Sequence, residues 1–307
     1  MLKRVDSERD PDSTCGGMDT SLLEDELPML RPLVTTEIDR LCKEFATAEP
    51  YHHVVINRFL DESWVRTALA DFPKADSGEW IHYFHVNERK LGRNKLELIP
   101  PTLAAIIREL NAPAFVALLE KITGIHGLVA DPTLEGGGLH QTMRGGFLNV
   151  HTDFSVHPHR QHWKRRVNLI VYLNDGWRDE YGGHLELWDR TMQHCARKIS
   201  PILNRAVIFD TTGDAFHGHP EPLACPEEMT RKSIALYYFT EESAPRVRAT
   251  DYRARPVDGG VKALWIFADK LALSLYDRMK RRLGWSDQRT SAILARLARL
   301  RRFGRRS

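Results

Sequence analysis

The feature that most constrains the fold is a series of short β-rich runs in the part of the chain that follows Gly124. β-Branched and aromatic residues dominate these runs, and Gly, Pro, Asn and Asp separate them. Each run is long enough for one strand and too short for an ordinary helix, and strands spaced this closely are typical of a sandwich or jelly roll. We expect strands at residues 138–143, 147–151, 167–173, 184–188, 198–199, 205–209 and 231–240.

Helical periodicity brackets the β-rich region on both sides. Before it, apolar residues recur at helical spacing, and one β-branched strand is expected at 54–57. After it, the helical period returns. We expect helices at 35–45, 62–70, 101–110, 115–122, 263–281 and 292–300.

The expected fold class is therefore α+β, with a sandwich or jelly-roll core; the family resemblance given below implies the double-stranded β-helix (jelly roll). A mobile leader is expected at 1–33, where Asp, Glu, Ser, Gly and Pro prevail. We expect a helical lead-in packed on the core at 34–125, the jelly-roll core at 126–247 and a basic helical extension at 248–307.

Positive charge is concentrated at the C-terminal end of the chain. The net charge is +3, yet residues 271–307 alone carry eleven Lys or Arg against two Asp. The preceding residues are therefore acidic on balance, and we expect no nucleic-acid-binding surface on the core.

Composition also limits the cellular location. A membrane-spanning helix needs an apolar run of about 18 uncharged residues, and we see no such run in the sequence. The first ten residues are charged where a secretory signal requires an apolar run, and the four cysteines show no CxxC spacing. We expect a cytoplasmic protein with free thiols.

Two histidines and an aspartate indicate a metal site. His151 and Asp153 lie two residues apart at the end of an expected strand, so alternation directs both side chains to the same side. A partner strand ending at His217 would complete a two-His, one-carboxylate site for non-haem Fe(II), which leaves coordination positions open. His219 would share the side of an extended strand with His217 and is the rival third ligand. The pattern alone is weak evidence, because His-x-Asp arises by chance.

Further motifs follow one another in a fixed order between residues 137 and 238. They read GxLHxxxxGGxLxxHxDF, YLNxxW, GGxLxLW, NRxVIF, FHGHP and RxSIALYY. This ordered set resembles the prolyl-4-hydroxylase-like branch of the Fe(II)/2-oxoglutarate-dependent dioxygenases. The resemblance covers residues 50–240 and is strongest over 138–240.

The resemblance implies an iron site made of His151, Asp153 and His217. It also implies Fe(II) as cofactor, 2-oxoglutarate and O2 as cosubstrates, and ascorbate as a candidate reductant. The implied activity is that of a dioxygenase that produces succinate and CO2 and hydroxylates an unidentified prolyl-like, amino-acid-like or small-molecule substrate.

The resemblance also implies an anchor for 2-oxoglutarate. Arg231 matches the basic residue that pairs with the distal carboxylate, for which a bidentate guanidinium is suited. Tyr172 matches a tyrosine whose hydroxyl assists the same carboxylate, and Ser233 is a second candidate hydroxyl. Alternation along 231–238 places Arg231 and Ser233 on one face.

Two positions depart from the family pattern. Arg231 follows His217 by 14 residues, a longer spacing than usual, because residues 223–228 form an inserted turn that is a candidate cover for the pocket. Gln141 stands ten residues before His151, where the family commonly has a tyrosine. We therefore expect the prime-substrate side to differ from the family pattern.

Two other functions compete with the dioxygenase. One is a non-catalytic jelly-roll binding protein that keeps the metal-site scaffold, and the other is a zinc-dependent hydrolase. A complete triad together with Arg231 favours the dioxygenase, because unpaired buried charges are costly without a use. The hydrolase has no evident general base and no role for Arg231.

The C-terminal residues form a basic amphipathic pattern. Its apolar stripe consists of Ile293, Leu294, Leu297 and Leu300, and arginines fill most of the remainder. We expect the stripe to be covered by the core, by a dimer or partner contact, or by an anionic membrane surface.

Overall fold

The computed structural model describes residues 26–31 and 36–283, and in the last helix it describes side chains through Leu271. The helices are α3 (Ile38–Thr47), α4 (Glu62–Ala70), α5 (Pro101–Leu110), α6 (Pro113–Thr123) and α7 (Gly260–Leu283), with short 3-10 turns η1 (Leu96–Leu98) and η2 (Asp179–Tyr181). The strands are β1 (His53–Asn57), β2 (Ile81–Phe84), β3 (Glu88–Arg93), β4 (Leu128–Ala130), β5 (Gly138–Met143), β6 (Phe147–Thr152), β7 (Trp163–Tyr172), β8 (Leu185–Trp188), β9 (Cys195–Ile199), β10 (Arg205–Asp210), β11 (His217–His219), β12 (Thr230–Glu241) and β13 (Asp251–Tyr252).

The strand order identifies the core as a jelly roll. Strands β10, β7, β12 and β5 form one antiparallel layer, and strands β6, β11, β8 and β9 form the other. Strand β3 joins the layers, since it pairs with both β5 and β6. Chain neighbours such as β5 and β6 therefore lie in different layers, as in a double-stranded β-helix. The jelly-roll prediction is confirmed.

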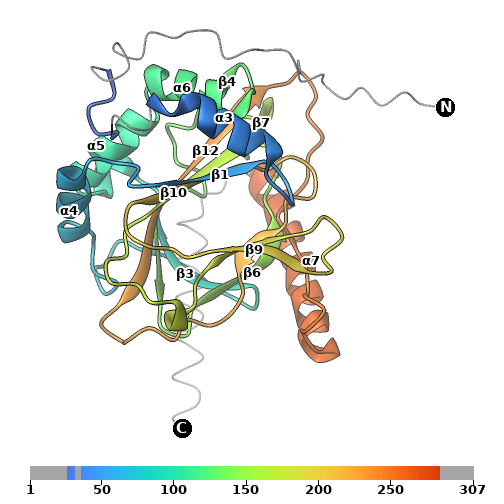
Figure 1. Ribbon diagram of the computed structural model, residues 1–307. Coiled ribbons are helices and arrows are strands. Elements are labelled where there is room, and N and C mark those ends of the chain that lie inside the picture. Colours follow the sequence, from blue (N-terminus) through green and yellow to red (C-terminus); the bar gives the residue numbers. More distant parts are fainter. Residues whose placement is uncertain (1–25, 32–35, 284–307) are drawn as a thin grey trace.

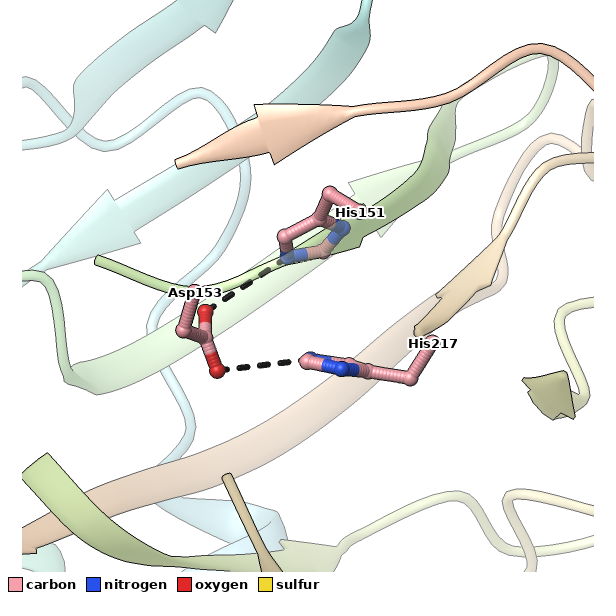
Figure 2. A group of neighbouring side chains, drawn as sticks. All are labelled: His151, Asp153 and His217. Atoms are coloured by element: carbon pink, nitrogen blue, oxygen red, sulfur yellow. Dashed lines mark ion pairs between the residues drawn. The ribbon is translucent and has the colours of Figure 1, made fainter. Parts of the chain in front are cut away.

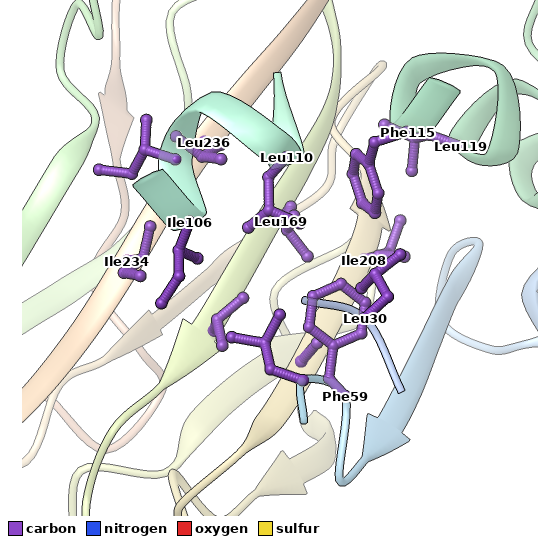
Figure 3. Close-up of a cluster of buried hydrophobic side chains, with 14 of the residues drawn as sticks. Leu30, Phe59, Ile106, Leu110, Phe115, Leu119, Leu169, Ile208, Ile234 and Leu236 are labelled. Atoms are coloured by element: carbon purple, nitrogen blue, oxygen red, sulfur yellow. The ribbon is translucent and has the colours of Figure 1, made fainter. Parts of the chain in front are cut away.

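A layer of helices covers the outer face of the first sheet layer. Helices α3, α5 and α6 lie together over it, whereas α7 lies apart from them at another side of the molecule (Figure 1). Apolar side chains of α5 and α6 pack on β7, β10 and β12 (Figure 3). The labelled residues of this core are Leu30, Phe59, Ile106, Leu110, Phe115, Leu119, Leu169, Ile208, Ile234 and Leu236.

Several elements differ from the sequence expectation. The lead-in is not only helical, because it also contributes the β2–β3 hairpin to the sheet. Its second strand, ERKLGR, is rich in charge and lacks apolar alternation, so periodicity does not reveal it. Strand β9 is longer than expected and largely exposed at the sheet edge. Most of the expected leader at 1–33, and the expected helix at 292–300, lie outside the described residues.

The helices in residues 26–31 and 36–283 are short or interrupted by charge. No single helix there is long and apolar enough to cross a membrane. The pair α5 and α6 reaches the required length and composition only jointly, with a bend of 53° between them.

A buried asparagine, Asn204, connects the lead-in to the jelly roll through hydrogen bonds. The Asn204 side chain accepts a hydrogen bond from Leu60 N at 2.8 Å and donates one to Leu60 O at 2.8 Å. Its backbone has φ 59°, a region that asparagine tolerates better than alanine does. Asn204 thus satisfies two backbone groups of the segment between β1 and α4.

We expect Asn204→Ala to lower the free energy of unfolding by about 2 to 4 kcal/mol, because it leaves two buried backbone groups unpaired and adds backbone strain. Urea denaturation measures the change. The exposed Asn57→Ala is the control, with an expected change below about 1 kcal/mol. Equal effects of the two variants would contradict this role of Asn204.

Candidate metal centre

Three side chains converge where the second sheet layer ends. His151 is on β6, Asp153 follows just after that strand, and His217 begins β11. The antiparallel register places His217 opposite His151, so the two imidazoles lie side by side with ring centroids 4.6 Å apart. Figure 2 shows both rings directed toward the carboxylate of Asp153. The structure thus brings together all three residues that the sequence singled out.

The distances between the three side chains suit one shared metal ion. Asp153 Oδ1 lies 3.6 Å from His151 Nε2, and Asp153 Oδ2 lies 3.5 Å from His217 Nε2. One ligand atom from each residue falls within 4.8 Å of the other two. Such separations allow one cation to contact two nitrogens and one oxygen.

Backbone carbonyls fix the tautomers of both histidines. His151 Nδ1 lies 2.9 Å from Asn149 O, and His217 Nδ1 lies 3.0 Å from Ala215 O. A carbonyl oxygen only accepts, so each Nδ1 carries the proton and each Nε2 presents a lone pair to the centre. Burial lowers the pKa of His217 to about 4, which keeps its imidazole neutral and able to bind a metal at neutral pH.

Asp153 is held as a carboxylate by two residues of β7. Asn168 Nδ2 donates to its Oδ2 at 2.8 Å, and Arg165 Nη2 lies 3.1 Å from the same oxygen. Burial alone would raise the pKa of Asp153, but the Arg165 guanidinium outweighs it and holds the pKa well below its usual value. Two neutral imidazoles and one carboxylate form the donor set that non-haem Fe(II) sites use, so the residues present fit that metal.

A second buried arginine lacks an internal counterion. Arg231 on β12 is 6% exposed, and its Nε donates to Gly183 O at 2.7 Å. Its Nη2 donates to the hydroxyl of Tyr172 at 3.2 Å. Among the described residues, no carboxylate forms an ion pair with Arg231. A buried cation without an anion is suited to a ligand that carries one.

The backbone at Gly183 makes room for this arginine. Its φ is +72°, and a Cβ there would lie 2.9 Å from Arg231 Cδ and 2.7 Å from Leu223 Cδ2. Leu223 begins the inserted turn at 223–228, which packs beside Trp177 next to Arg231. Gly183 thus lies between Leu223 of the turn and the Arg231 side chain.

Strand register determines the sheet face on which each of the remaining candidate pocket residues lies. Ser233 pairs with Tyr172 of β7 and with His140 of β5, and directly paired residues point to the same face of a sheet. His140 therefore shares the face of Ser233 and Tyr172. Gln141 points to the opposite face, where its amide donates to the Thr230 hydroxyl at 2.8 Å.

His219 does not join the metal group. The register shifts between His217 and His219, so His219 pairs with Leu148 of β6. Its side chain is buried, and its Nδ1 has no hydrogen-bond partner among the residues that the structure describes. The structure groups His217, and not His219, with His151 and Asp153.

Sequence reasoning missed a chain of charged residues that enters the site from β3. Lys90 Nζ lies 3.1 Å from Glu88 Oε2, and Glu88 Oε1 lies 2.9 Å from His85 Nε2. Tyr252 of β13 places its ring 5.3 Å from that of His151. These residues belong to β3, to β13 and to the turn before β3, none of which the hydrophobic pattern predicts.

Comparison with known proteins finds a family model and a curated relative that are similar to the central part of the chain. A model of the 2OG-Fe(II) oxygenase superfamily matches residues 137–239. The mouse prolyl 3-hydroxylase OGFOD1 is 29% identical over 144 residues, which make up 45% of this chain and 24% of that protein. The chain thus spans about a quarter of the length of this curated relative.

Solved structures of prolyl hydroxylases are also similar. A prolyl-4-hydroxylase from Pseudomonas putida is 19% identical with a TM-score of 0.46, over 67% of this chain and 100% of that chain. A structure from work on prolyl 4-hydroxylases of Phytophthora capsici is 18% identical with a TM-score of 0.46, over 94% of each chain. The fold assignment rests on the strand order and register of this chain itself.

The buried histidines make stability depend on pH. Burial and the nearby Lys90 lower the pKa of His140 to about 3, so the native state keeps this imidazole neutral. In the unfolded chain a histidine binds a proton below about pH 6.5, so acid favours the unfolded state. The pKa of His85 is raised, so protonation of His85 in acid favours the native state and opposes the effect of His140. The contribution of His140 is therefore measured by comparing variants.

We expect the free energy of unfolding of the wild type to fall between pH 7 and pH 5 by up to about 2 kcal/mol more than that of His140→Leu. Urea denaturation at the two pH values measures the difference. The exposed His126→Leu is the matched control and should keep the wild-type dependence. An unchanged dependence in His140→Leu would contradict a neutral His140 in the native state.

Proposed function

We propose that this chain, whose residues 137–239 form a domain of the 2OG-Fe(II) oxygenase superfamily, is a 2-oxoglutarate-dependent dioxygenase that hydroxylates a prime substrate. One observation carries the proposal. The His151, Asp153 and His217 group occurs in the same protein as a buried Arg231 for which the described residues provide no carboxylate. A metal site alone fits many functions, but a metal site with an unpaired buried guanidinium fits a metal-binding dicarboxylate.

His151 and His217 would hold Fe(II) through their Nε2 atoms, and Asp153 would hold it through its carboxylate. Bound Fe(II) would supply the redox chemistry that couples O2 to oxidation of 2-oxoglutarate, with succinate and CO2 as products. The protein residues prepare the donors. Arg165 and Asn168 keep Asp153 ionised and oriented, and the carbonyls of Asn149 and Ala215 keep each Nε2 unprotonated.

Arg231 would anchor the distal carboxylate of 2-oxoglutarate. The Tyr172 hydroxyl already contacts its guanidinium, and Ser233 lies opposite Tyr172 on the same sheet face. Arg231 Nε donates a hydrogen bond to Gly183 O, and this bond orients the guanidinium before the ligand binds. Preorganisation of this kind lowers the entropic cost of binding.

The proposed substrate class is a prolyl or other amino-acid-like group, or a small molecule of comparable size. Its support is the similarity to a protein named as a prolyl 3-hydroxylase. We propose ascorbate as the reductant and the cytoplasm as the location.

The first test of the function is spectroscopic. Anaerobic addition of Fe(II) and 2-oxoglutarate should produce a weak visible charge-transfer absorption in the wild type. We expect His151→Ala, Asp153→Ala and His217→Ala to lose it, because each removes one metal ligand, whereas His219→Ala should retain iron binding. Circular dichroism checks that each variant is folded.

Two outcomes of this test would contradict the proposal. Absence of the absorption in the folded wild type would favour a non-catalytic jelly-roll protein. Loss of iron binding in His219→Ala alone would reverse the assignment of the third ligand.

The second test separates cosubstrate binding from metal binding. We expect Arg231→Ala to weaken 2-oxoglutarate binding by about tenfold to a few hundredfold, which corresponds to about 1.5 to 3 kcal/mol for a charge-assisted pair. Its affinity for Fe(II) should change little. Titration of the charge-transfer band with 2-oxoglutarate measures the effect.

Lys232→Ala is the matched control for Arg231→Ala, because Lys232 is the next residue and points to the opposite face of β12. It pairs with Gln141 in the sheet and should keep the wild-type affinity. Equal affinities of the two variants would remove Arg231 from the cosubstrate site.

A further inference from the structure

Helix α7 is attached to the barrel by a polar face. Asp269 Oδ2 lies 2.8 Å from His85 Nδ1 and accepts a hydrogen bond from Asn87 Nδ2 at 2.6 Å. Lys270 forms an ion pair with Asp251 of β13, and Ile266 is buried beside these contacts. These contacts fix the rotation of α7 about its own axis.

The outer face of α7 is apolar and exposed. Large apolar side chains along it and just before it are more than half exposed, which is unusual for a helix of a soluble domain. We call this set the α7 stripe; it consists of Val257 (77%), Val261 (74%), Leu264 (66%), Trp265 (60%), Phe267 (54%) and Leu271 (55%). The usual arrangement is inverted, because the polar side of the helix faces the protein and the apolar side faces outward.

Rotation of α7 cannot bury this stripe. Turning it inward would withdraw Asp269 from His85 and Asn87 and would break the ion pair of Lys270. At the start of the helix, Lys262 is also paired with Asp258, which in turn holds the buried Arg255. Rotation of α7 alone therefore leaves the stripe exposed.

Charge decides between the candidate surfaces. From Leu271 onward the chain carries eleven Lys or Arg against two Asp. A second copy that met this stripe with its own stripe would bring the same excess of positive charge to the contact, and residues 284–307 of this chain are themselves basic. Within residues 257–271 both acidic side chains, Asp258 and Asp269, are already paired. The complementary surface is an anionic one that also accepts Trp, Phe and Leu side chains.

We propose that the α7 stripe docks this protein on an anionic lipid surface, with the helix lying in the interface. Exposed Trp265 and Phe267 are residue types that favour this interface. Neighbouring basic residues add attraction to anionic lipids, and salt weakens that attraction. The proposal is independent of the iron chemistry, because no residue of the metal centre belongs to α7.

Co-sedimentation of the full chain with lipid vesicles tests the proposal. The wild type should sediment with phosphatidylcholine vesicles that contain about one third phosphatidylglycerol. Partitioning should be at least about tenfold weaker with phosphatidylcholine alone, and added salt should reduce it. The variant Leu264→Asp/Phe267→Asp should partition to the anionic vesicles at least about tenfold more weakly than the wild type, because it places charges in the apolar stripe.

Val247→Asp is the matched control, since Val247 is a similarly exposed apolar residue (55%) outside α7. It should bind vesicles like the wild type. The milder Leu264→Ser/Phe267→Ser should weaken binding in the same direction, and the charge-transfer band with Fe(II) and 2-oxoglutarate should be the same in all these proteins.

Three results would overturn the proposal. One is a wild type that does not sediment with anionic vesicles. Another is equal sedimentation of the wild type and Leu264→Asp/Phe267→Asp. The third is a lipid-free dimer, seen by sedimentation velocity, that this double variant dissociates, because the stripe would then be a contact between protein copies.

Discussion

The antiparallel register between β6 and β11 is the constraint on which the rest of the site depends. Side chains alternate along a strand, so a slip of one residue would turn His217 away from His151 and present Gly218 in its place. Gly218 itself enforces the register. A Cβ at this position would lie 2.8 Å from Leu148 O and 2.9 Å from Asn149 O, so another residue would push β11 away from β6. Close approach of two strands therefore brings two metal ligands together.

Two buried arginines in this barrel differ in what surrounds them, and the difference separates their roles. The guanidinium of Arg165 pairs with Asp153 and stacks 3.4 Å from the ring centroid of Tyr237, so its charge is already balanced. Arg231 contacts only a carbonyl and a phenol among the described residues, and burial lowers its pKa. A protein has little reason to bury such a cation unless a ligand brings the anion. Arg165 thus belongs to the framework of the candidate metal centre, and Arg231 is the proposed anchor for a second molecule.

The sequence predicts those parts of the site that lie within regular strands and recognisable motifs. Alternation placed His151 and Asp153 on one side because both follow the same strand. The same reasoning could not separate His217 from His219, because a register shift, which periodicity does not reveal, decides between them. Lys90 was missed because its strand, β3, is charged and carries no apolar pattern. Contacts between distant segments depend on how the strands are ordered in space, and local sequence carries little information about that order.

Helix α7 and the interior of the barrel are joined by side chains of alternating charge. Asp269 contacts His85, His85 contacts Glu88, and Glu88 pairs with Lys90, whose charge acts on Asp153. Burial alone would lower the pKa of His85, but Glu88 and Asp269 outweigh it and raise the pKa, which favours the cationic form between the two carboxylates. Withdrawal of Asp269 would leave His85 and Lys90 to share one carboxylate. The contacts of α7 thus reach, through His85 and Glu88, a lysine whose charge acts on Asp153.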